Sequence, residues 1–205
     1  MSVKADLTVN PKATPVSDTG LQAAGFCDDL AERASRWHEG AALVEDLTPD
    51  EITTLGALMP KVRAQAGQAL IREGETGDWM LLLLSGTIDV TKATETGTPS
   101  RLAVIKGGRA VGEMSMLDGS PRYATCTALE DVEAAMLTRA TISALIREHP
   151  GIGAKLLVQL TQLLARRLRN TSNQVVRLLQ KQGDGGLDGK LRRWTDKATE
   201  VPAAD

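Results

Sequence analysis

Short apolar stretches separated by glycine occupy the middle of the chain. Between Lys61 and Arg139, nine glycines interrupt hydrophobic runs of strand length. Runs of this kind, bounded by turn-forming residues, are typical of β-strands. The pattern predicts eight strands, at 62–65, 68–72, 79–84, 87–92, 101–106, 110–112, 122–129 and 132–138. We therefore expect an α+β fold built on an eight-stranded antiparallel β jelly-roll barrel, with N-terminal helices and a long C-terminal helix.

Helical patterns precede the predicted strands. Between residues 21 and 44, apolar residues recur at helical spacing at Leu30, Ala34, Trp37 and Ala41. This period predicts one amphipathic helix. Farther along, Thr48 is followed by Pro49 and then, three residues after the threonine, by Glu51. That order is typical of a capping box at the start of a helix, which we expect to end near Leu58.

Two more helices are expected after the strands. A short one covers 141–148 and ends at His149-Pro150-Gly151, and a long one runs from about Ile152 to Gln180. The long helix carries an apolar seam of heptad type, formed by Leu157, Leu164, Leu168, Thr171, Val175 and Leu178. Such a seam fits packing against its own domain and fits equally a homodimer formed through the 152–180 helix.

Composition divides the chain into four segments. Residues 1–20 are polar and contain two prolines, so we expect a disordered arm there. Residues 21–45 form the helical extension, and 46–182 form one domain that includes the long helix. Residues 183–205 read as a Gly-rich linker followed by a basic tail.

Overall composition and charge narrow the class of protein. The 205 residues are 42% hydrophobic and 24% charged, which excludes disorder throughout and a membrane bundle. Residues 1–150 contain 14 Lys/Arg and 21 Asp/Glu, a formal charge of −7, whereas 151–205 contain 10 and 5, a formal charge of +5. This asymmetry fits contact with an acidic partner, an anionic lipid face or nucleic acid, and it fits equally a solvated helix surface.

Cysteine and histidine usage bears on compartment and catalysis. Cys27 and Cys126 are isolated, and no apolar targeting segment is present, so we expect a reducing cytoplasm and no membrane span. The two histidines, His38 and His149, lie outside the predicted strands. The His and carboxylate ligands of jelly-roll metal enzymes are therefore missing, and no nucleophile pairs with a base. We expect no enzymatic activity, no metal and no cofactor.

The stretch VGEMSMLDGSPRYAT, residues 111–125, carries the candidate chemistry. Gly112 lets the backbone approach a ligand closely, and Glu113 offers a carboxylate to hydroxyl donors. The amides of Met114 to Met116 point inward if a helical turn begins there. Arg122 supplies a planar guanidinium suited to phosphate oxygens. Together these residues predict a small pocket for an anion.

This stretch closely resembles the phosphate-binding cassette of the cyclic nucleotide-binding domain family, which includes cAMP-dependent kinase regulatory subunits, catabolite-activator-type regulators and gated channels. The likeness extends to LTPDE at 47–51, which matches the family's lead-in helix. GQALIREG at 67–74 and GDWMLLLLSG at 77–86 match its first barrel strands. The resemblance covers about residues 46–172, so it is more specific than a lone short motif.

The resemblance implies a cyclic nucleotide sensor. Glu113 would accept a hydrogen bond from the ribose 2′-hydroxyl, and Arg122 would bind the cyclised phosphate. The implied ligand-binding residues are Gly112, Glu113, Met114, Ser115, Pro121, Arg122, Tyr123 and Ala124, with the amides of Ser115 and Ala124 completing the phosphate site. The threonine or serine that the family associates with guanine is absent, so cAMP is favoured over cGMP. Ligand binding would move the helix after Pro150 to control a protein partner or a second copy.

An alternative rests on Tyr123, which stands where the family usually has a small residue after the cassette arginine. If its ring fills the pocket, the fold no longer binds nucleotide and serves as a protein–protein interaction module. A DNA-binding regulator is the other alternative, but only about 25 residues follow the long helix, too few for a winged helix-turn-helix. Trp79 has apolar neighbours in a predicted strand and is interpreted as a core residue.

Overall fold

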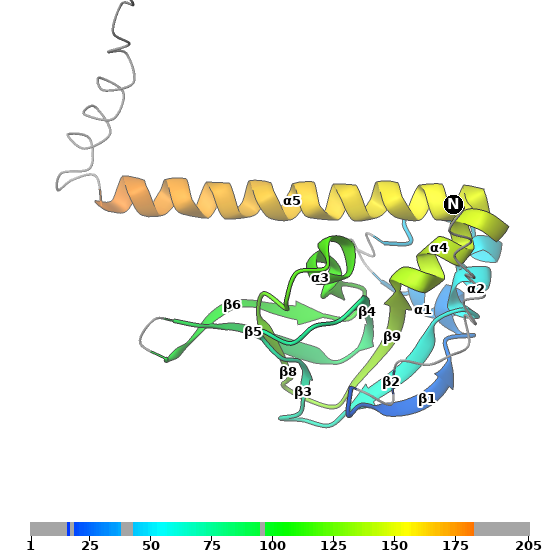
Figure 1. Ribbon diagram of the computed structural model, residues 1–205, viewed down its shortest axis with the longest axis horizontal. Helices are drawn as coiled ribbons and strands as arrows, with labels where there is room; N and C mark the ends of the chain where they lie inside the picture. Colours follow the sequence, from blue (N-terminus) through cyan, green and yellow to red (C-terminus); the bar gives the residue numbers. More distant parts are fainter. Residues whose placement is uncertain (1–15, 17–18, 38–42, 95–96, 183–205) are drawn as a thin grey trace, which may run out of the picture. The chain divides into compact units, whose positions relative to one another are not determined.

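The computed structural model describes residues 16, 19–37, 43–94 and 97–182. The chain forms two units, residues 1–160 and residues 161–205. The first unit contains the sheets, the four shorter helices and the start of the long helix α5 (Figure 1). The predicted tail at 183–205 lies outside the described residues, as does most of the predicted arm. Val16 is an exception, because it is buried in the core.

Within the described residues, nine strands form two antiparallel sheets, with the orders β1-β2-β9-β4-β7 and β3-β8-β5-β6. The strands are β1 (Gln22–Phe26), β2 (Pro60–Ala64), β3 (Ala69–Ile71), β4 (Trp79–Ser85), β5 (Thr87–Ala93), β6 (Pro99–Lys106), β7 (Ala110–Val111), β8 (Thr125–Ala128) and β9 (Val132–Thr138). Each of the eight predicted strands overlaps one of them. The sheets do not close into one barrel, so the prediction of a jelly roll holds in its sandwich form and the eight-stranded barrel does not.

The ninth strand, β1, lies where a helix was expected. Instead of one helix over 21–44, the chain forms β1, then the short helix α1 (Leu30–Ala34). Gly25 has a φ of +80°, which a helix cannot contain, and Ala23 pairs with Val62 of β2. Leu30 and Ala34 of the helical spacing lie in α1, whereas Ala41 lies outside the described residues. The predicted extension 21–45 is partly a strand of the sheet.

The predicted capping box is confirmed at α2 (Pro49–Gly56). The Thr48 hydroxyl accepts from the amide of Glu51 at 3.3 Å, and the Glu51 carboxylate accepts from the amide of Thr48 at 2.8 Å. The same carboxylate also accepts from Lys155 Nζ of α5 at 2.7 Å. The lead-in helix is thus tied to the first turns of the long helix.

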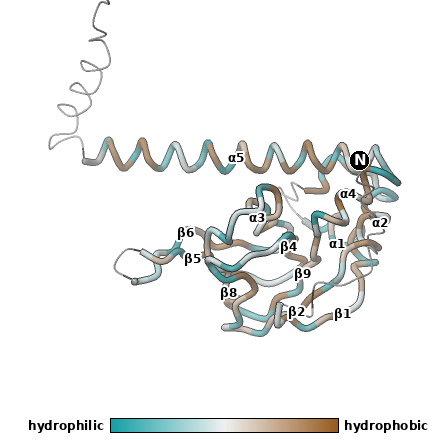
Figure 2. Tube along the Cα trace, in the orientation of Figure 1, coloured by the Kyte–Doolittle hydropathy of each residue, from teal (hydrophilic) through white to brown (hydrophobic). Residues whose placement is uncertain are grey.

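The predicted C-terminal helices are α4 (Arg139–Glu148) and α5 (Pro150–Gln182). Figure 2 shows hydrophobic and hydrophilic residues alternating along α5. In the first unit its buried apolar side chains are Ile152, Leu156 and Leu160. Leu157 of the predicted seam is exposed, so the face that packs on the domain is a different one. Among the helices of the described residues, none is long and apolar enough to cross a membrane.

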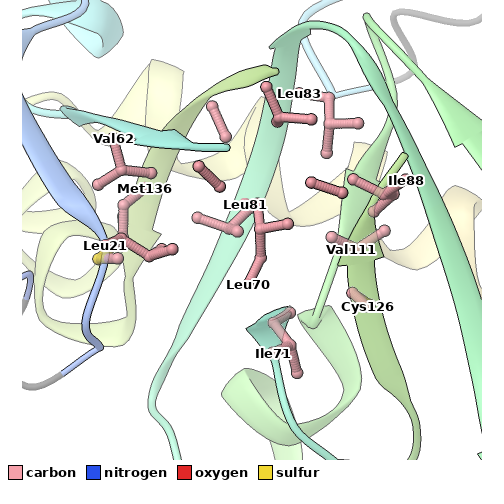
Figure 3. Close-up of a cluster of buried hydrophobic side chains, with 14 of the residues drawn as sticks. Leu21, Val62, Leu70, Ile71, Leu81, Leu83, Ile88, Val111, Cys126 and Met136 are labelled. Carbon is pink, nitrogen blue, oxygen red and sulfur yellow. The ribbon is translucent and has the colours of Figure 1, made fainter. Parts of the chain in front are cut away.

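Hydrophobic side chains of both sheets meet in one core. Leu81 and Met136 come from the first sheet, and Ile88 and Cys126 from the second, and all four are buried (Figure 3). Val111 and Ile71 belong to the same cluster. These two residues lie next to the cassette in space, so the core provides a rigid wall against which the candidate site is built.

Candidate functional site

Gly112 joins strand β7 to the short helix α3 (Glu113–Asp118) in a left-handed conformation, with a φ of +83°. A side chain at this position would have its Cβ 2.8 Å from Arg122 Nη1 and 2.9 Å from Ile71 Cδ1. Both distances are shorter than real contacts allow. The backbone at Gly112 therefore lies close to the guanidinium of the cassette arginine, while its approach to a ligand stays a prediction.

Arg122 is buried, with an exposed fraction of 4%. Its Nη1 donates to the carbonyl oxygen of Gly112 at 2.8 Å. The guanidinium carbon lies 4.2 Å from the centre of the Trp79 ring, a distance at which the cation is attracted by the ring face. One bond and one ring contact thus fix the direction of the guanidinium.

The backbone of Arg122 is held by the loop after β3. Its amide donates to the carbonyl of Glu75 at 2.8 Å, and its carbonyl accepts from the amide of Gly74 at 2.9 Å. On the same loop, a Cβ at Gly77 would clash with the guanidinium, lying 3.0 Å from Cζ and 3.1 Å from Nε. Glycine at position 77 is therefore needed to let the arginine lie against this loop.

The electrostatics of Arg122 favour an anionic ligand. Burial lowers the pKa of Arg122, while nearby carboxylates, including those of Asp78 and Glu113, act in the opposite direction. Its Nη2 is buried and has no hydrogen-bond partner among the described residues. A buried donor on a charged group that lacks a partner costs free energy. An anion bound at Nη2 would remove that cost.

The other predicted site residues divide into two groups. Glu113 and Ser115 are buried at the start of α3. Glu113 is close enough to Arg122 to raise the pKa of the arginine. Gly112, Glu113 and Arg122 are thus brought together. Met114 and Pro121 are exposed, and Ala124 is half-buried.

Tyr123 lies at the surface of the protein. The side chain is 55% exposed, and Lys92 Nζ lies 4.4 Å from the centre of its ring. The lysine also donates to the carbonyl of Tyr123 at 2.8 Å and to the carboxylate of Glu73 at 2.6 Å. A ring held at the surface by a cation does not fill a buried pocket. This placement does not support the alternative in which Tyr123 fills the pocket.

We expect Tyr123→Ala to leave the affinity for a ligand at Arg122 within about threefold of the original, as is usual for a surface substitution. Tyr123→Phe, which keeps the ring over Lys92, is the matched control. Titration calorimetry with cAMP measures both variants. An affinity at least ten times higher for the alanine variant would contradict the observed placement and indicate that the ring occupies the site.

Sequence reasoning missed the contribution of Trp79. The residue is partly buried and packs against the core cluster, as interpreted, but its ring also covers the guanidinium of Arg122. The signal was available in the sequence, since Trp79 directly follows Gly77-Asp78 and begins the buried strand β4 within the stretch that resembles the family. Arg139 was missed as well, and its side chain donates to the carbonyl of Met116 in α3 at 2.8 Å.

A surface hollow exists elsewhere, along β1, β2 and the start of β9. It is lined by Gly20, Leu21, Gln22, Arg63, Ala64, Gln65, Gln68, Ser85, Asp131, Val132 and Glu133. None of these is a predicted ligand-binding residue. The hollow is therefore separate from the predicted ligand-binding residues.

Comparison with known proteins relates the chain to cyclic nucleotide-binding proteins. The family profile described as "Cyclic nucleotide-binding domain" matches residues 61–149. The chain is 28% identical over 139 residues to the CRP-like cAMP-activated global transcriptional regulator of Mycobacterium tuberculosis, covering 68% of this chain and 60% of that protein. It is also 28% identical over 159 residues to lysophospholipase nte1 of Aspergillus niger, covering 78% of this chain and 10% of that protein.

A solved structure extends the similarity to the fold. The crystal structure of a cyclic nucleotide-binding domain from Methylobacillus flagellatus KT superposes with a TM-score of 0.67 at 29% sequence identity. The match covers 82% of this chain and 94% of that one. By contrast, the chain spans 60% or less of the length of the two curated relatives.

Proposed function

Because the chain belongs to the cyclic nucleotide-binding domain family, we propose that it is a non-enzymatic sensor that binds cAMP in preference to cGMP. The regulator of Mycobacterium tuberculosis that it resembles is cAMP-activated by name, which supports this choice of nucleotide. The cytoplasm is the proposed compartment, since both cysteines are free thiols buried in the fold.

A single observation carries the proposal. Arg122 is buried beside Glu113, stacked on Trp79, and retains one Nη2 donor with no partner among the described residues. A phosphate oxygen is the kind of acceptor that a guanidinium donor binds most strongly. The site is thus arranged for an anion rather than for a neutral ligand.

The remaining roles follow from what lies around that donor. Glu113 would accept from the ribose 2′-hydroxyl, since its carboxylate is buried and near enough to the guanidinium to raise the pKa of Arg122. The amides of Ser115 and Ala124 would complete the phosphate site. A ligand carrying a negative phosphate and an adjacent hydroxyl donor satisfies both side chains, as a cyclic nucleotide does.

Titration calorimetry and thermal unfolding with cAMP and cGMP test the proposal, with 5′-AMP as a control that lacks the cyclised phosphate. We expect binding heat and a raised unfolding temperature with cAMP, weaker effects with cGMP, and the weakest with 5′-AMP. Ligand at one hundred times its Kd would add about 2.7 kcal/mol to the free energy of unfolding. The proposal would be refuted if millimolar cAMP and cGMP produced no binding heat and no thermal shift.

The proposed output is a change at the long helix that controls a protein partner or a second copy of the chain. Lys155 of α5 is bonded to Glu51 of α2, and Gln159 of α5 donates to Asp46. These contacts give α5 a defined starting position from which a ligand could move it. Farther along, Leu168 and Leu178 belong to the apolar seam of heptad type, and such a seam fits the pairing of two helices.

A further inference from the structure

The second half of α5 carries positive charge that the helix itself does not neutralise. Residues 161–180 contain four arginines, and residues 150–182 contain neither Asp nor Glu. Surface helices commonly pair opposite charges three or four residues apart. No such pair can form within α5, because the helix has no carboxylate side chain. This half of the helix is therefore uniformly basic.

Apolar and basic residues occupy opposite sides of this half of α5. Leu164, Leu168 and Val175 follow one another at spacings of four and seven residues, which place them on one face of a helix. Arg166 stands two residues from both Leu164 and Leu168, and Arg177 stands two residues from Val175. A spacing of two residues reaches the opposite side of a helix. The helix is therefore amphipathic, with arginine on its polar side.

The apolar side of this half has no neighbour within the described part of its own unit. Among residues 161–182, α5 is the only element. A single helix cannot bury its apolar face on itself, and helices gain most of their stability from packing that face against another surface. The apolar side thus needs an occupant from outside the described part of this unit.

Charge and width favour a lipid surface as that occupant. Pairing of two copies would bring the arginines of both together, whereas paired helices are commonly held by opposite charges beside their seam. Val176 and Leu179 widen the apolar side beyond the narrow stripe along which two helices meet. Anionic headgroups complement the arginines, and acyl chains complement the broad apolar side.

We propose that residues 161–180 of α5 bind in the plane of an anionic lipid bilayer, with the leucine and valine side toward the acyl chains and the arginines at the headgroup phosphates. An amphipathic helix with a cationic polar side binds lipid in this way without spanning the bilayer. Guanidinium groups donate strongly to phosphate oxygens. Lipid binding of this kind goes beyond the sensor function and requires no bound nucleotide.

Flotation of the full chain with lipid vesicles tests the binding. Vesicles of phosphatidylglycerol and phosphatidylcholine in equal parts should carry the protein upward in the gradient, and phosphatidylcholine alone should carry roughly tenfold less or lower still. Added salt should weaken binding to the anionic vesicles, because mobile ions screen the attraction between headgroups and arginines. Calorimetry with cAMP on the same preparation reports the sensor function separately.

Variants of each side of the helix test the two contributions. Arg166→Gln combined with Arg169→Gln should lower the affinity for the anionic vesicles roughly 10- to 30-fold. Leu168→Gln keeps the charge and should lower that affinity roughly tenfold, because an apolar side chain is lost from the buried side. Arg109→Gln combined with Arg147→Gln removes the same charge from exposed positions of the first unit. This matched control should bind vesicles as the original does.

Three outcomes would overturn the lipid-binding role and leave the sensor function standing. One is equally weak flotation with anionic and neutral vesicles, or flotation that neither helix variant changes. Another is a dimer in sedimentation velocity that Leu168→Gln dissociates, with no flotation of the original protein, which assigns the apolar side to a second copy. The last is duplex DNA binding as strong as vesicle binding, with neither weakened by Leu168→Gln. Circular dichroism checks folding, and if one helix variant fails to fold, the other decides by the same criterion.

Discussion

Replacing Arg122 with alanine is expected to weaken cAMP binding by about one to two orders of magnitude. Hydrogen bonds to a charged group contribute roughly 1.5–3 kcal/mol, and the variant loses them all. It also leaves the carboxylate of Glu113 buried without the neighbouring positive charge. Titration calorimetry measures the affinity, and urea unfolding monitors the stability of the free protein.

Two further variants serve as controls for the Arg122→Ala result. Arg122→Lys keeps the charge but not the planar guanidinium, so its affinity should lie between those of the original and the alanine variant. Arg101→Ala removes an exposed arginine paired with Asp89 on the β5–β6 hairpin, and its cAMP affinity should not change. Equal affinities for Arg122→Ala and Arg101→Ala would show that the phosphate does not bind at Arg122.

Replacing Gly112 with alanine is expected to lower the free energy of unfolding by about 2–5 kcal/mol. The left-handed conformation costs a side chain roughly 1–2 kcal/mol. Overpacking of the new methyl group against Arg122 Nη1 and Ile71 Cδ1 adds roughly 1–3 kcal/mol. Because the guanidinium must move to admit the methyl group, cAMP affinity should fall as well. Urea unfolding and calorimetry measure the two effects.

Gly67 provides the matched control for that substitution. Its φ of +81° is nearly the same, but a Cβ at Gly67 would have nothing within 4 Å. Gly67→Ala should therefore lose only the conformational part, about 1–2 kcal/mol, and should keep its cAMP affinity. Equal losses of stability in the two variants would contradict the close contact between Gly112 and the cassette arginine.

Local signals allowed much of the fold to be predicted. Glycine punctuation located eight of the strands, because turns with positive φ occur between them at positions such as Gly67, Gly74 and Gly86. The capping box at Thr48 placed the start of α2 because both of its hydrogen bonds are made within three residues. The strand β1 was not predicted, because it depends on pairing with β2, whose partner residues are about forty positions away. The division into two sheets was not predicted either, because it joins strands far apart in sequence, such as β3 and β8.

The candidate site was likewise predictable where it depends on local sequence and not where it depends on contacts between distant segments. Gly112, Glu113 and Arg122 were predicted from one continuous stretch, and the structure brings them together. The direction of Tyr123 was not predictable, since it depends on Lys92 in another strand. The contact between Trp79 and Arg122 likewise joins segments far apart in sequence. The identity of the main site residues was therefore predictable from the sequence, whereas the directions of their side chains depend on the tertiary fold.

A crystal structure of the protein with cAMP tests the central claim most directly. We expect a phosphate oxygen within about 2.7–2.9 Å of Arg122 Nη2, the ribose 2′-hydroxyl donating to Glu113, and the Trp79 ring still covering the guanidinium. A nucleotide bound elsewhere on the chain, with Arg122 making only its bond to Gly112, would contradict the account.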